Sequence, residues 1–380
     1  MKKLLAAALI LPVLWLAGCS TQDPALRPSP LPIFSPSMSV KSVWSKSIGD
    51  GASGYYLHLQ PALSNGNLYV ASYDGVLMAI RAQTGQVLWE TRSASHYVSG
   101  VSIDAGKLFV ATNSGKLMAV NQNDGAVLWT SSLNSQSLAR PEAYNGMVLV
   151  HTIDGAVTAF RESDGGQLWQ YKQTVPGLIL HLASQPQLAG QYAVCGFANG
   201  TVATLHASDG KLMWSRQVAE PQGATVIERM VDIDVSPIVA NGVVYVGSYQ
   251  GKLVALNIID GKTLWQRNVS VYAGLAADHH YLFLSDAGGN VSAYDQSNGS
   301  VFWTQKGLAR RGLTAPTIAG PNSLVVGDKE GYVHWMSLKD GHFLAQARAA
   351  LDPIIGAPVA EGHYVFVYSQ SGRLIAYRTS

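Results

Sequence analysis

The sequence contains few charged residues, and those few are nearly balanced in sign. Of 380 residues only 13% are charged, with 26 Lys and Arg against 24 Asp and Glu, which gives a formal charge of +2. Proteins that bind nucleic acid need many cationic contacts to phosphates, because those contacts supply much of the affinity. The composition therefore argues against a polynucleotide partner.

Motifs of common catalytic and cofactor sites are also missing. Neither HExxH nor GxSxG occurs, and the adjacent His279 and His280 would point to opposite faces of a strand. A GxGxxG match at residues 49–54 is followed by Tyr55 and Tyr56 rather than by a helix, so it is expected to be a loop. We expect no metal, no cofactor and no catalytic activity, although a site assembled from distant loops would leave no motif.

Glycine and aromatic residues are abundant instead. The chain has 38 Gly, 17 Tyr and 9 Trp. Such a composition suits an architecture of short strands and tight turns better than a helical one. An all-β fold is the first expectation.

The first residues have the form of a bacterial lipoprotein signal. An apolar run follows Lys2 and Lys3, and residues 16–19 (Leu-Ala-Gly-Cys) resemble the lipobox, in which the cysteine is lipidated and becomes the new N-terminus. We therefore expect residues 1–18 to be a signal peptide and Cys19 to carry acyl chains, the alternative being a secretory signal with a chance cysteine. Ser20 resembles an outer-membrane address, which predicts a lipid anchor in the outer membrane and a body in the periplasm.

Residues 19–40 are rich in proline and nearly free of charge. This composition favours extended polyproline conformation, so we predict a tether that could hold the body up to roughly 60 Å from the membrane. The remaining cysteine, Cys195, lies in an apolar strand pattern and is expected to be a small core residue.

From Trp44 onward the sequence is built from eight similar units. A Gly-x-(Leu/Val) step is followed by an apolar run, a second glycine and, four residues later, a tryptophan. The first glycines are Gly75, Gly115, Gly155, Gly200, Gly251, Gly289, Gly331 and Gly372. A period of about 40 residues is typical of propeller blades, and the Asn-Gly and Asp-Gly pairs predict tight hairpins. Residues 41–380 are thus predicted to form an eight-bladed β-propeller of four-stranded antiparallel blades.

The two ends of the sequence are complementary. The eighth unit stops after its third strand, whereas residues 43–47 form a tryptophan strand that no unit precedes. We therefore expect the N-terminal strand to complete the C-terminal blade and close the ring. Six innermost strands are expected to begin at a proline, whose missing N–H is tolerated at a strand start: Pro61, Pro141, Pro186, Pro237, Pro316 and Pro358.

The repeated tryptophans permit two interpretations. They could form an aromatic surface for a ligand, or they could wedge between adjacent blades. Equal placement in successive units favours the wedge for Trp44, Trp89, Trp129, Trp169, Trp214, Trp265 and Trp303. The seventh unit has Ala345 at this position.

Two connections depart from the repeat, and they are the candidates for partner binding because the blades alone need only stability. Residues 171–182 are unusually apolar for an exposed loop, and residues 228–236 contain Asp232 and Asp234 on one face of an extended chain. Two carboxylates on one face need a cation, either Arg229 or a partner's arginine. The alternative is an internal ion pair that only orders the loop. Since the two connections leave neighbouring blades, they could form one patch.

A further basic pair lies before the seventh blade. Arg310 and Arg311 are a weaker candidate for an interaction site, and a solvated pair of charges is the simpler expectation.

The units resemble the quinoprotein-dehydrogenase type of propeller repeat, with its Gly-x-x-x-Trp signature. Together with the lipobox and the tether, residues 51–56, 229–237 and 326–335 resemble the propeller lipoproteins of the bacterial outer-membrane β-barrel assembly machinery. The resemblance covers essentially the whole chain. It implies a non-catalytic scaffold that binds the periplasmic domains of the central insertase, BamA, together with other components of the machinery and nascent outer-membrane proteins, and that assists insertion of β-barrels.

In that family the partner contacts lie on the two irregular connections. The resemblance assigns partner binding to Leu178, Leu180, His181, Asp232 and Asp234, and the charge pattern adds Arg229 to this candidate site. Relatives have an arginine where His181 stands, so no single ion pair is expected to hold the partner, although a histidine can still donate a hydrogen bond. Arg229 is expected to order its loop.

Two other functions remain as alternatives. Exposed tyrosines would also suit a propeller that binds peptidoglycan or another polysaccharide. A dehydrogenase dependent on pyrroloquinoline quinone has the same type of blade, but such enzymes stack their cofactor on a disulfide between adjacent cysteines, which cysteines at 19 and 195 cannot form.

Overall fold

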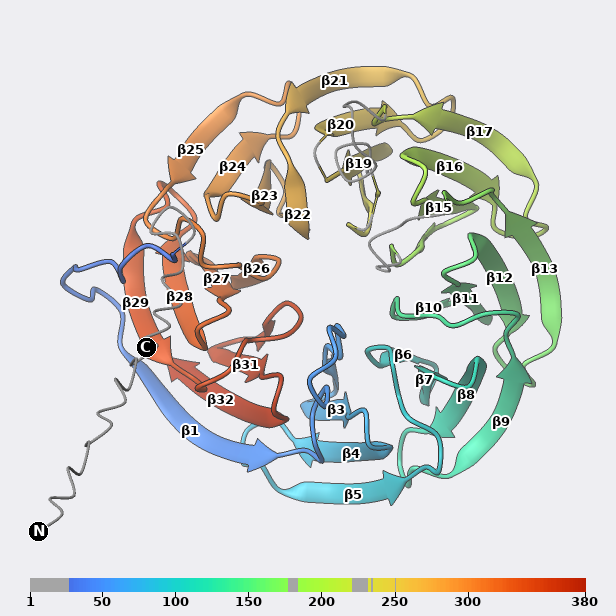
Figure 1. Ribbon diagram of the computed structural model, residues 1–380, viewed down its shortest axis with the longest axis horizontal. Helices are drawn as coiled ribbons and strands as arrows, with labels where there is room; N and C mark the ends of the chain where they lie inside the picture. The colour runs from blue at the N-terminus through green and yellow to red at the C-terminus, as the bar shows by residue number, and fades with distance from the viewer. Residues whose placement is uncertain (1–26, 177–183, 221–231, 234, 250) are drawn as a thin grey trace, which may run out of the picture.

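The chain forms a ring of eight four-stranded antiparallel sheets around a central channel (Figure 1). The computed structural model describes residues 27–176, 184–220, 232–233, 235–249 and 251–380. These residues form strands, turns and loops and contain no helix. Accordingly, no membrane-spanning helix is found among them. The predicted all-β, eight-bladed propeller is confirmed.

Each blade is named here by its place along the chain, and its strands run from the channel to the rim. Blades 1 to 4 comprise β2 (Ala62–Ser64), β3 (Asn67–Ala71), β4 (Val76–Arg81) and β5 (Val87–Arg92); β6 (Ser102–Asp104), β7 (Lys107–Thr112), β8 (Lys116–Asn121) and β9 (Val127–Ser132); β10 (Glu142–Tyr144), β11 (Met147–His151), β12 (Ala156–Arg161) and β13 (Gln167–Lys172); β14 (Gln187–Ala189), β15 (Tyr192–Gly196), β16 (Thr201–His206) and β17 (Leu212–Gln217).

The remaining blades follow the same order, except that the last one recruits the first strand of the chain. Blades 5 to 8 comprise β18 (Ile238–Ala240), β19 (Val243–Gly247), β20 (Lys252–Asn257) and β21 (Thr263–Asn268); β22 (Val271–Ala277), β23 (Tyr281–Asp286), β24 (Val291–Asp295) and β25 (Val301–Gln305); β26 (Thr317–Ala319), β27 (Ser323–Gly327), β28 (Tyr332–Ser337) and β29 (Phe343–Arg348); β30 (Val359–Glu361), β31 (Tyr364–Tyr368), β32 (Arg373–Thr379) and β1 (Val40–Ser47).

The antiparallel order gives the ring two distinct faces. One face has the connections from each rim strand to the next inner strand and the turns between second and third strands; we call it the connection face. The other has the two remaining hairpin turns of each blade; we call it the hairpin face. In blade 1 these hairpins place Asn65 at φ 51° and Gly66 at φ 70°, which is the left-handed region that the predicted Asn-Gly turn requires.

The ring closes as predicted. β1 pairs antiparallel with β32, with Val40 opposite Thr379 and Ser47 opposite Arg373. The ends of the chain thus share one sheet, so the closing blade needs residues from both ends. The six prolines predicted to open inner strands each stand immediately before one: β2, β10, β14, β18, β26 and β30.

The tryptophan wedge is confirmed at every blade interface that has one. Each indole Nε1 donates a hydrogen bond to a backbone oxygen in the next blade, at 2.8 to 3.0 Å. Each indole also packs on the second glycine of the next unit, where a Cβ would collide with the ring; Trp129 lies on Gly165 in this way. Glycine and tryptophan of successive units are therefore one packing motif shared between two blades.

Ala345 departs from this motif because the next blade has no hairpin to receive an indole. In blade 8 the third and fourth strands, β32 and β1, come from opposite ends of the chain. By its place in the repeat, the acceptor would be the backbone oxygen of Thr379 at the end of β32, and Thr379 is paired with Val40 of β1. An alanine therefore suffices at position 345, where it is buried.

Residues 27–39 of the predicted tether lie against blade 7, and we call them the N-terminal arm. The backbone N–H of Ser29 donates to Ala309 O at 2.9 Å, and the ring of Phe34 stacks on Phe343 with 5.4 Å between centroids. Further along, the N–H of Met38 donates to Leu344 O at 3.2 Å. The arm thus crosses the rim of blade 7 from the connection face to the hairpin face, where β1 begins.

The expectation of a solvated pair at Arg310 and Arg311 was wrong. Arg310 Nε donates to Arg27 O at 2.8 Å, while the side chain of Arg311 is 5% exposed and donates to Asp328 at 2.6 Å and to Ser29 O at 2.9 Å. Both arginines therefore fix the arm to the connection face. The charge pattern alone does not reveal this role, because the carboxylate and the two carbonyls come from distant parts of the sequence.

Two smaller expectations are confirmed. Residues 49–54 form turns between β1 and β2, not a nucleotide-binding helix start. Cys195 is buried in the core between blades 3 and 4, and burial raises the pKa of its thiol to about 12. A thiol that stays protonated is a poor nucleophile, so Cys195 is a packing residue.

Candidate partner-binding face

Most residues that the sequence assigns to partner binding lie outside the described part of the chain, as does the predicted lipidation site. They are Cys19, Leu178, Leu180, His181, Arg229 and Asp234. For these the assignment stays a prediction. The structure does describe Asp232 and the segments that flank both connections.

The described ends of the two irregular connections touch one another. Ser184 Oγ donates to Val235 O at 3.1 Å, and the backbone N–H of Gln185 donates to Ser236 Oγ at 3.2 Å. Ser184 in turn accepts a hydrogen bond at 3.0 Å from the ring nitrogen of the buried His151. The connection into blade 4 and the connection into blade 5 therefore end side by side on the connection face.

The beginnings of the same connections are held by one residue, Asn199, in the turn between β15 and β16. Its Nδ2 donates to Thr174 O at 3.2 Å in the first connection. Its backbone oxygen accepts from Gln217 Nε2 at 2.9 Å, next to the start of the second connection. Blade 4 thus presents both connections from a common support.

Asp232 is buried in the propeller, with 1% of its surface exposed. Its backbone oxygen accepts from the N–H of Tyr249 at 3.2 Å, and the adjacent Ile233 packs into the core between blades 4 and 5. A Cβ on Gly196 would collide with Ile233, so the glycine leaves room for this side chain. The sequence predicted that the aspartates of this segment and its apolar residues would point to opposite faces of an extended chain. Burial does not alternate in this way, because Asp232, Ile233 and Val235 are all buried.

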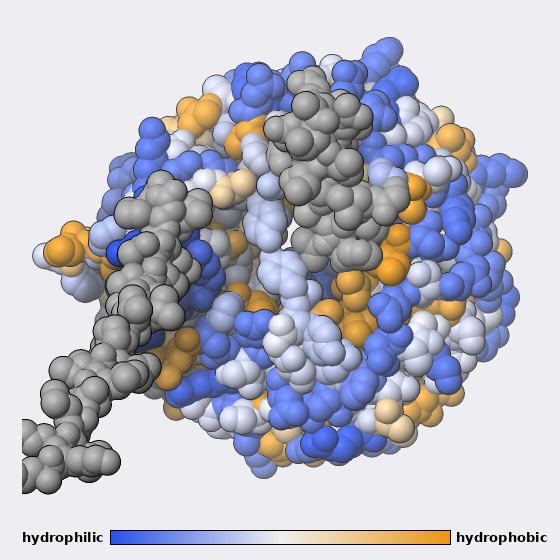
Figure 2. Space-filling view, in the orientation of Figure 1, coloured by the Kyte–Doolittle hydropathy of each residue, from blue (hydrophilic) through white to orange (hydrophobic). Residues whose placement is uncertain are grey.

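Aromatic residues gather on the connection face at a place that the sequence repeat does not mark. Tyr73 stacks on His96, with 4.5 Å between the rings, and Tyr55 lies 4.6 Å from Tyr73. Nearby, the hydroxyls of Tyr56 and Tyr272 are 2.7 Å apart although they belong to blades 1 and 6. Figure 2, which shows this face, has mainly hydrophilic residues at the rim and apolar residues scattered among them.

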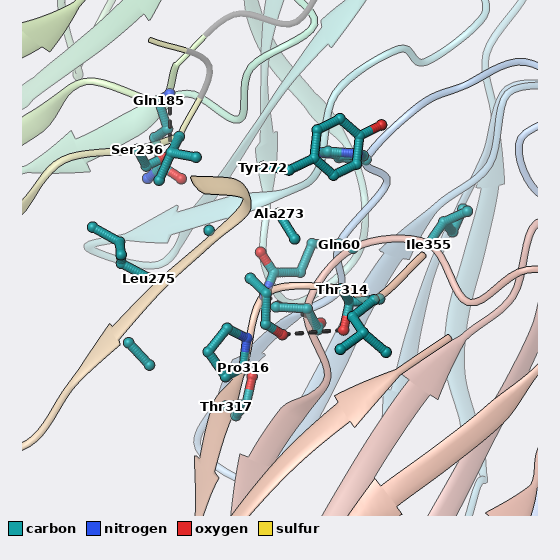
Figure 3. A pocket seen from close by; sticks show the side chains of 18 of the residues that line it. Gln60, Gln185, Ser236, Tyr272, Ala273, Leu275, Thr314, Pro316, Thr317 and Ile355 are labelled. Atoms are coloured by element: carbon teal, nitrogen blue, oxygen red, sulfur yellow. Dashed lines mark hydrogen bonds between the residues drawn. The ribbon is translucent and has the colours of Figure 1, made fainter. Parts of the chain in front are cut away.

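A cavity of about 680 Å³ opens into the channel beneath these tyrosines. Figure 3 shows side chains from several blades converging on it, among them Gln60, Gln185, Tyr272 and Thr314. A second cavity of about 550 Å³ lies along the channel and shares Gln60, Arg140 and Thr317 with the first. These three residues therefore mark the boundary between the two cavities.

Arg140 belongs to a polar chain that crosses this boundary. Its Nε donates to Gln185 Oε1 at 3.2 Å, and Gln185 Nε2 donates to Glu142 Oε2 at 2.6 Å. Burial raises the pKa of the Glu142 carboxyl, while the hydrogen bond from Gln185 and the charge of Arg140 oppose that rise. The sequence signals none of these contacts, because the three residues come from two blades.

Metal chemistry has no support in the described residues. Within ranges 27–176, 184–220, 232–233, 235–249 and 251–380, no three His, Cys, Asp or Glu side chains are grouped so that they could hold an ion. In the described residues the connection face combines loop ends held by hydrogen bonds, aromatic side chains and a cavity.

Comparison with known proteins agrees with the resemblance in the sequence. Residues 39–99 and 96–305 match the family model described as outer membrane protein assembly factor BamB. The chain is 45% identical over 372 residues to the assembly factor BamB of Pseudomonas aeruginosa, with 98% of each chain covered. Among solved structures, BamB from Moraxella catarrhalis superposes with a TM-score of 0.81 at 25% identity, over 90% of this chain and all of that one.

A more distant likeness concerns the fold alone. A quinohemoprotein alcohol dehydrogenase from Comamonas testosteroni has a TM-score of 0.71, at 13% identity, over 89% of this chain and 76% of that one.

Proposed function

Since the chain belongs to the family of the outer membrane protein assembly factor BamB, we propose that it serves as a non-catalytic scaffold in the assembly of outer-membrane β-barrel proteins. The observation that carries this proposal is identity of 45% over 98% of the chain to a relative with that name. Likeness over the full length includes the irregular connections as well as the blades, and such connections are where function resides.

The proposed location is the outer membrane, with the propeller in the periplasm. Residues 16–19 support lipidation of Cys19, and two or more acyl chains would make release from the membrane negligible. Attachment in this proposal rests on the lipid.

The proposed partner is the periplasmic part of the insertase BamA, bound on the connection face of blades 3 to 5. Leu178 and Leu180 would provide apolar anchors, and Asp234 would pair with a cation of the partner; His181 would donate a hydrogen bond. The contact between Ser184 and Val235 supports this arrangement, because it brings the two connections together.

Asp232 and Arg229 are given supporting positions in this proposal. Because Asp232 is buried in the free chain, its role is to hold the second connection in place rather than to meet the partner. Arg229 would order the same loop. The internal alternative for the acidic pair thus applies to Asp232, and the partner-directed one to Asp234.

The two alternative functions have weaker support. A dehydrogenase shares the fold at 13% identity, and the fold alone does not establish a reaction. His96 stacked on Tyr73, with Tyr55 tilted beside them, would suit a sugar ring, but the same aromatic group suits protein contacts.

Co-purification from detergent-solubilised outer membranes tests the proposal. The tagged wild-type chain is expected to retain BamA, and Leu180→Ala/Asp234→Ala is expected to lose it while keeping its melting temperature. The matched control is Leu128→Ala/Asp124→Ala, which removes an exposed leucine and an exposed aspartate from blade 2.

Each outcome has a distinct meaning. If the control also loses BamA, the effect is not specific to the connection face. If both variants retain it, the patch is wrong although the scaffold role stands. If the wild type retains no BamA, the scaffold role itself is wrong.

A further inference from the structure

The cavity on the connection-face side of the channel is large enough to bury a small organic molecule. Its volume of about 680 Å³ lies within the range of typical ligand pockets, about 300 to 1,000 Å³. Residues from at least five blades line it, so a ligand there would be surrounded by the inner strands and connections of several blades rather than by one loop.

The walls are mainly apolar. Leu275 and Ala276 of the long inner strand β22, Leu313 of the connection into blade 7, and Ile354 and Ile355 of the connection into blade 8 contribute aliphatic side chains. An apolar ligand would displace water from these aliphatic walls favourably.

The charged residues that line the cavity directly are cations, and the nearest carboxylate, Glu142, lies beyond Gln185 in the second cavity, where its charge acts on Arg140. Arg140 and Lys329 line it, whereas no aspartate or glutamate occurs among its described lining residues. His58 is reached by solvent through the cavity, yet burial among protein atoms lowers the pKa of its ring, so it adds no charge at neutral pH. The charged groups that face the cavity, Arg140 and Lys329, favour an anionic occupant over a cationic one.

Arg140 is held in position through its Nε, and its two η nitrogens have no hydrogen-bond partner among the described residues. Its Nε is used by Gln185, and Gln185 is fixed in turn by Glu142 and Ser236. The structure gives the two η nitrogens no hydrogen-bond partner in the described residues, and no carboxylate there forms a salt bridge with Arg140. Four N–H groups thus remain for a ligand, in the planar geometry that suits a carboxylate or sulfonate.

We propose that this cavity is a binding site for an apolar molecule that bears one carboxylate or similar anionic group. The anion binds the guanidinium of Arg140 at the inner end, the apolar body lies against Leu275, Leu313 and Ile355, and Lys329 adds a second positive charge at the rim. The hydrogen-bonded Tyr56 and Tyr272 stand at the outer end of the cavity. The cavity adjoins the proposed BamA-binding connections, since Val235 and Ser236 line it, but the argument for the site does not rest on the proposed contacts with BamA.

Two fluorescent probes that differ only in the anion test the proposal on the purified, folded chain. 8-Anilinonaphthalene-1-sulfonate has the required charge, and N-phenyl-1-naphthylamine is the same apolar body without it. Arg140→Gln is expected to raise the dissociation constant of the sulfonate about tenfold or more, since hydrogen bonds to charged groups are strong. Binding of the uncharged probe should change by less than about twofold, because the apolar walls remain.

Three further variants separate the site from general effects of charge and folding. Arg140→Lys keeps the charge and should recover part of the sulfonate affinity. Lys329→Gln lies on the exposed rim, cannot disturb the core, and should weaken the sulfonate more modestly. Arg92→Gln makes the same change of net charge at an exposed site on blade 1 and should leave both probes unaffected.

Competition identifies the source of the natural ligand. Dodecanoate represents a fatty acid, and N-acetyl-trileucine with a free carboxylate represents a peptide C-terminus, with its amide as the uncharged control. Displacement of the sulfonate probe by either acid supports the site, and the stronger competitor indicates the source. The proposal is overturned if neither acid competes, if the amide competes as well as the acid, or if Arg140→Gln and Arg92→Gln affect the sulfonate equally.

Discussion

Trp129 illustrates how a single side chain joins two blades. It begins in β9 of blade 2, packs on Gly165 of blade 3, and donates its indole N–H to Glu162 O at 2.9 Å. The wedge satisfies the one polar group of the ring while its apolar surface fills the interface. The second glycine of seven units packs directly against the tryptophan of the preceding blade, and a Cβ at that position would collide with the indole ring.

Replacing this wedge should destabilise the propeller substantially. Trp129→Ala is expected to lower the free energy of unfolding by about 3 to 5 kcal/mol, because it opens a cavity between blades. Urea unfolding followed by circular dichroism measures the loss. The neighbouring Leu128 is 46% exposed, so Leu128→Ala should cost less than about 1 kcal/mol; equal losses in the two variants would refute the wedge.

Asp328 is the most heavily hydrogen-bonded carboxylate in the described interior. It is fully buried and accepts from Arg311 at 2.6 Å, from His334 at 3.0 Å, and from the backbone N–H groups of Glu330 and Tyr332 at 2.9 Å each. Burial alone would raise the pKa of its carboxyl, but these partners outweigh burial and lower the pKa below the ordinary value of 3.8.

This pKa shift predicts a specific dependence of stability on pH. A group whose pKa is lower in the folded state contributes stability above its unfolded value, and the contribution is lost as the pH falls through the folded value. Asp328→Asn should therefore cost about 3 to 5 kcal/mol near neutral pH, because it leaves Arg311 without its counter-ion. The difference from wild type should narrow below about pH 4.

Urea unfolding between about pH 7 and pH 3 measures this difference. Asp340→Asn is the control, because Asp340 pairs with His342 at the surface, where 56% of each side chain is exposed. A gap between wild type and Asp328→Asn that stays constant down to pH 3 would contradict the assigned shift.

At the scale of elements, the N-terminal arm is the feature that the repeat could not reveal. A proline-rich composition predicts an extended chain, and residues 27–39 contain no strand before Ser39. What composition cannot specify is where an extended segment rests. Here Phe34 stacks on Phe343. Arg310 and Arg311 of the connection into blade 7 donate hydrogen bonds to the backbone oxygens of Arg27 and Ser29, respectively.

Removing the aromatic contact should release the arm. Phe34→Ala is expected to cost about 1 to 2 kcal/mol for the partly buried ring and to speed hydrogen exchange at the amides of Ser37 and Met38, which donate to Leu344 O. Ile33 beside it is fully exposed, so Ile33→Ala is the matched control and should change neither quantity. Similar exchange in both variants would mean that the stacked pair does not hold the arm.

Loops and strands differ in how far the sequence specifies them. Strand positions follow from periodic apolar residues and from glycines at fixed turns, so each blade was predictable. The chain from Arg140 through Gln185 to Glu142, and the hydroxyl contact between Tyr56 and Tyr272, were not. Such contacts depend on which side chains the closed ring brings together across the channel, and no local pattern records that.

The whole molecule is held by closure. β1 and β32 share seven opposed residue pairs, and the core clusters follow one another around the ring from blade to blade. This closure was predictable from the sequence, because the last unit lacks its fourth strand and the N-terminal tryptophan strand belongs to no unit of its own. Together the two parts complete one four-stranded blade. The candidate partner site was predictable only as far as the segments that depart from the repeat.

The docked arm also limits how the protein could lie at a membrane, given the lipid anchor that we propose. Arg27 is fixed on the connection face, and it lies only eight residue steps along the chain from the anchor proposed at Cys19. Eight residues span at most roughly 28 Å even when fully stretched, about half the reach of an undocked tether. The propeller would then lie close to the lipid, with its connection face and the channel opening on that face tilted toward the bilayer. A partner that binds this face would have to enter the narrow space between the propeller and the bilayer.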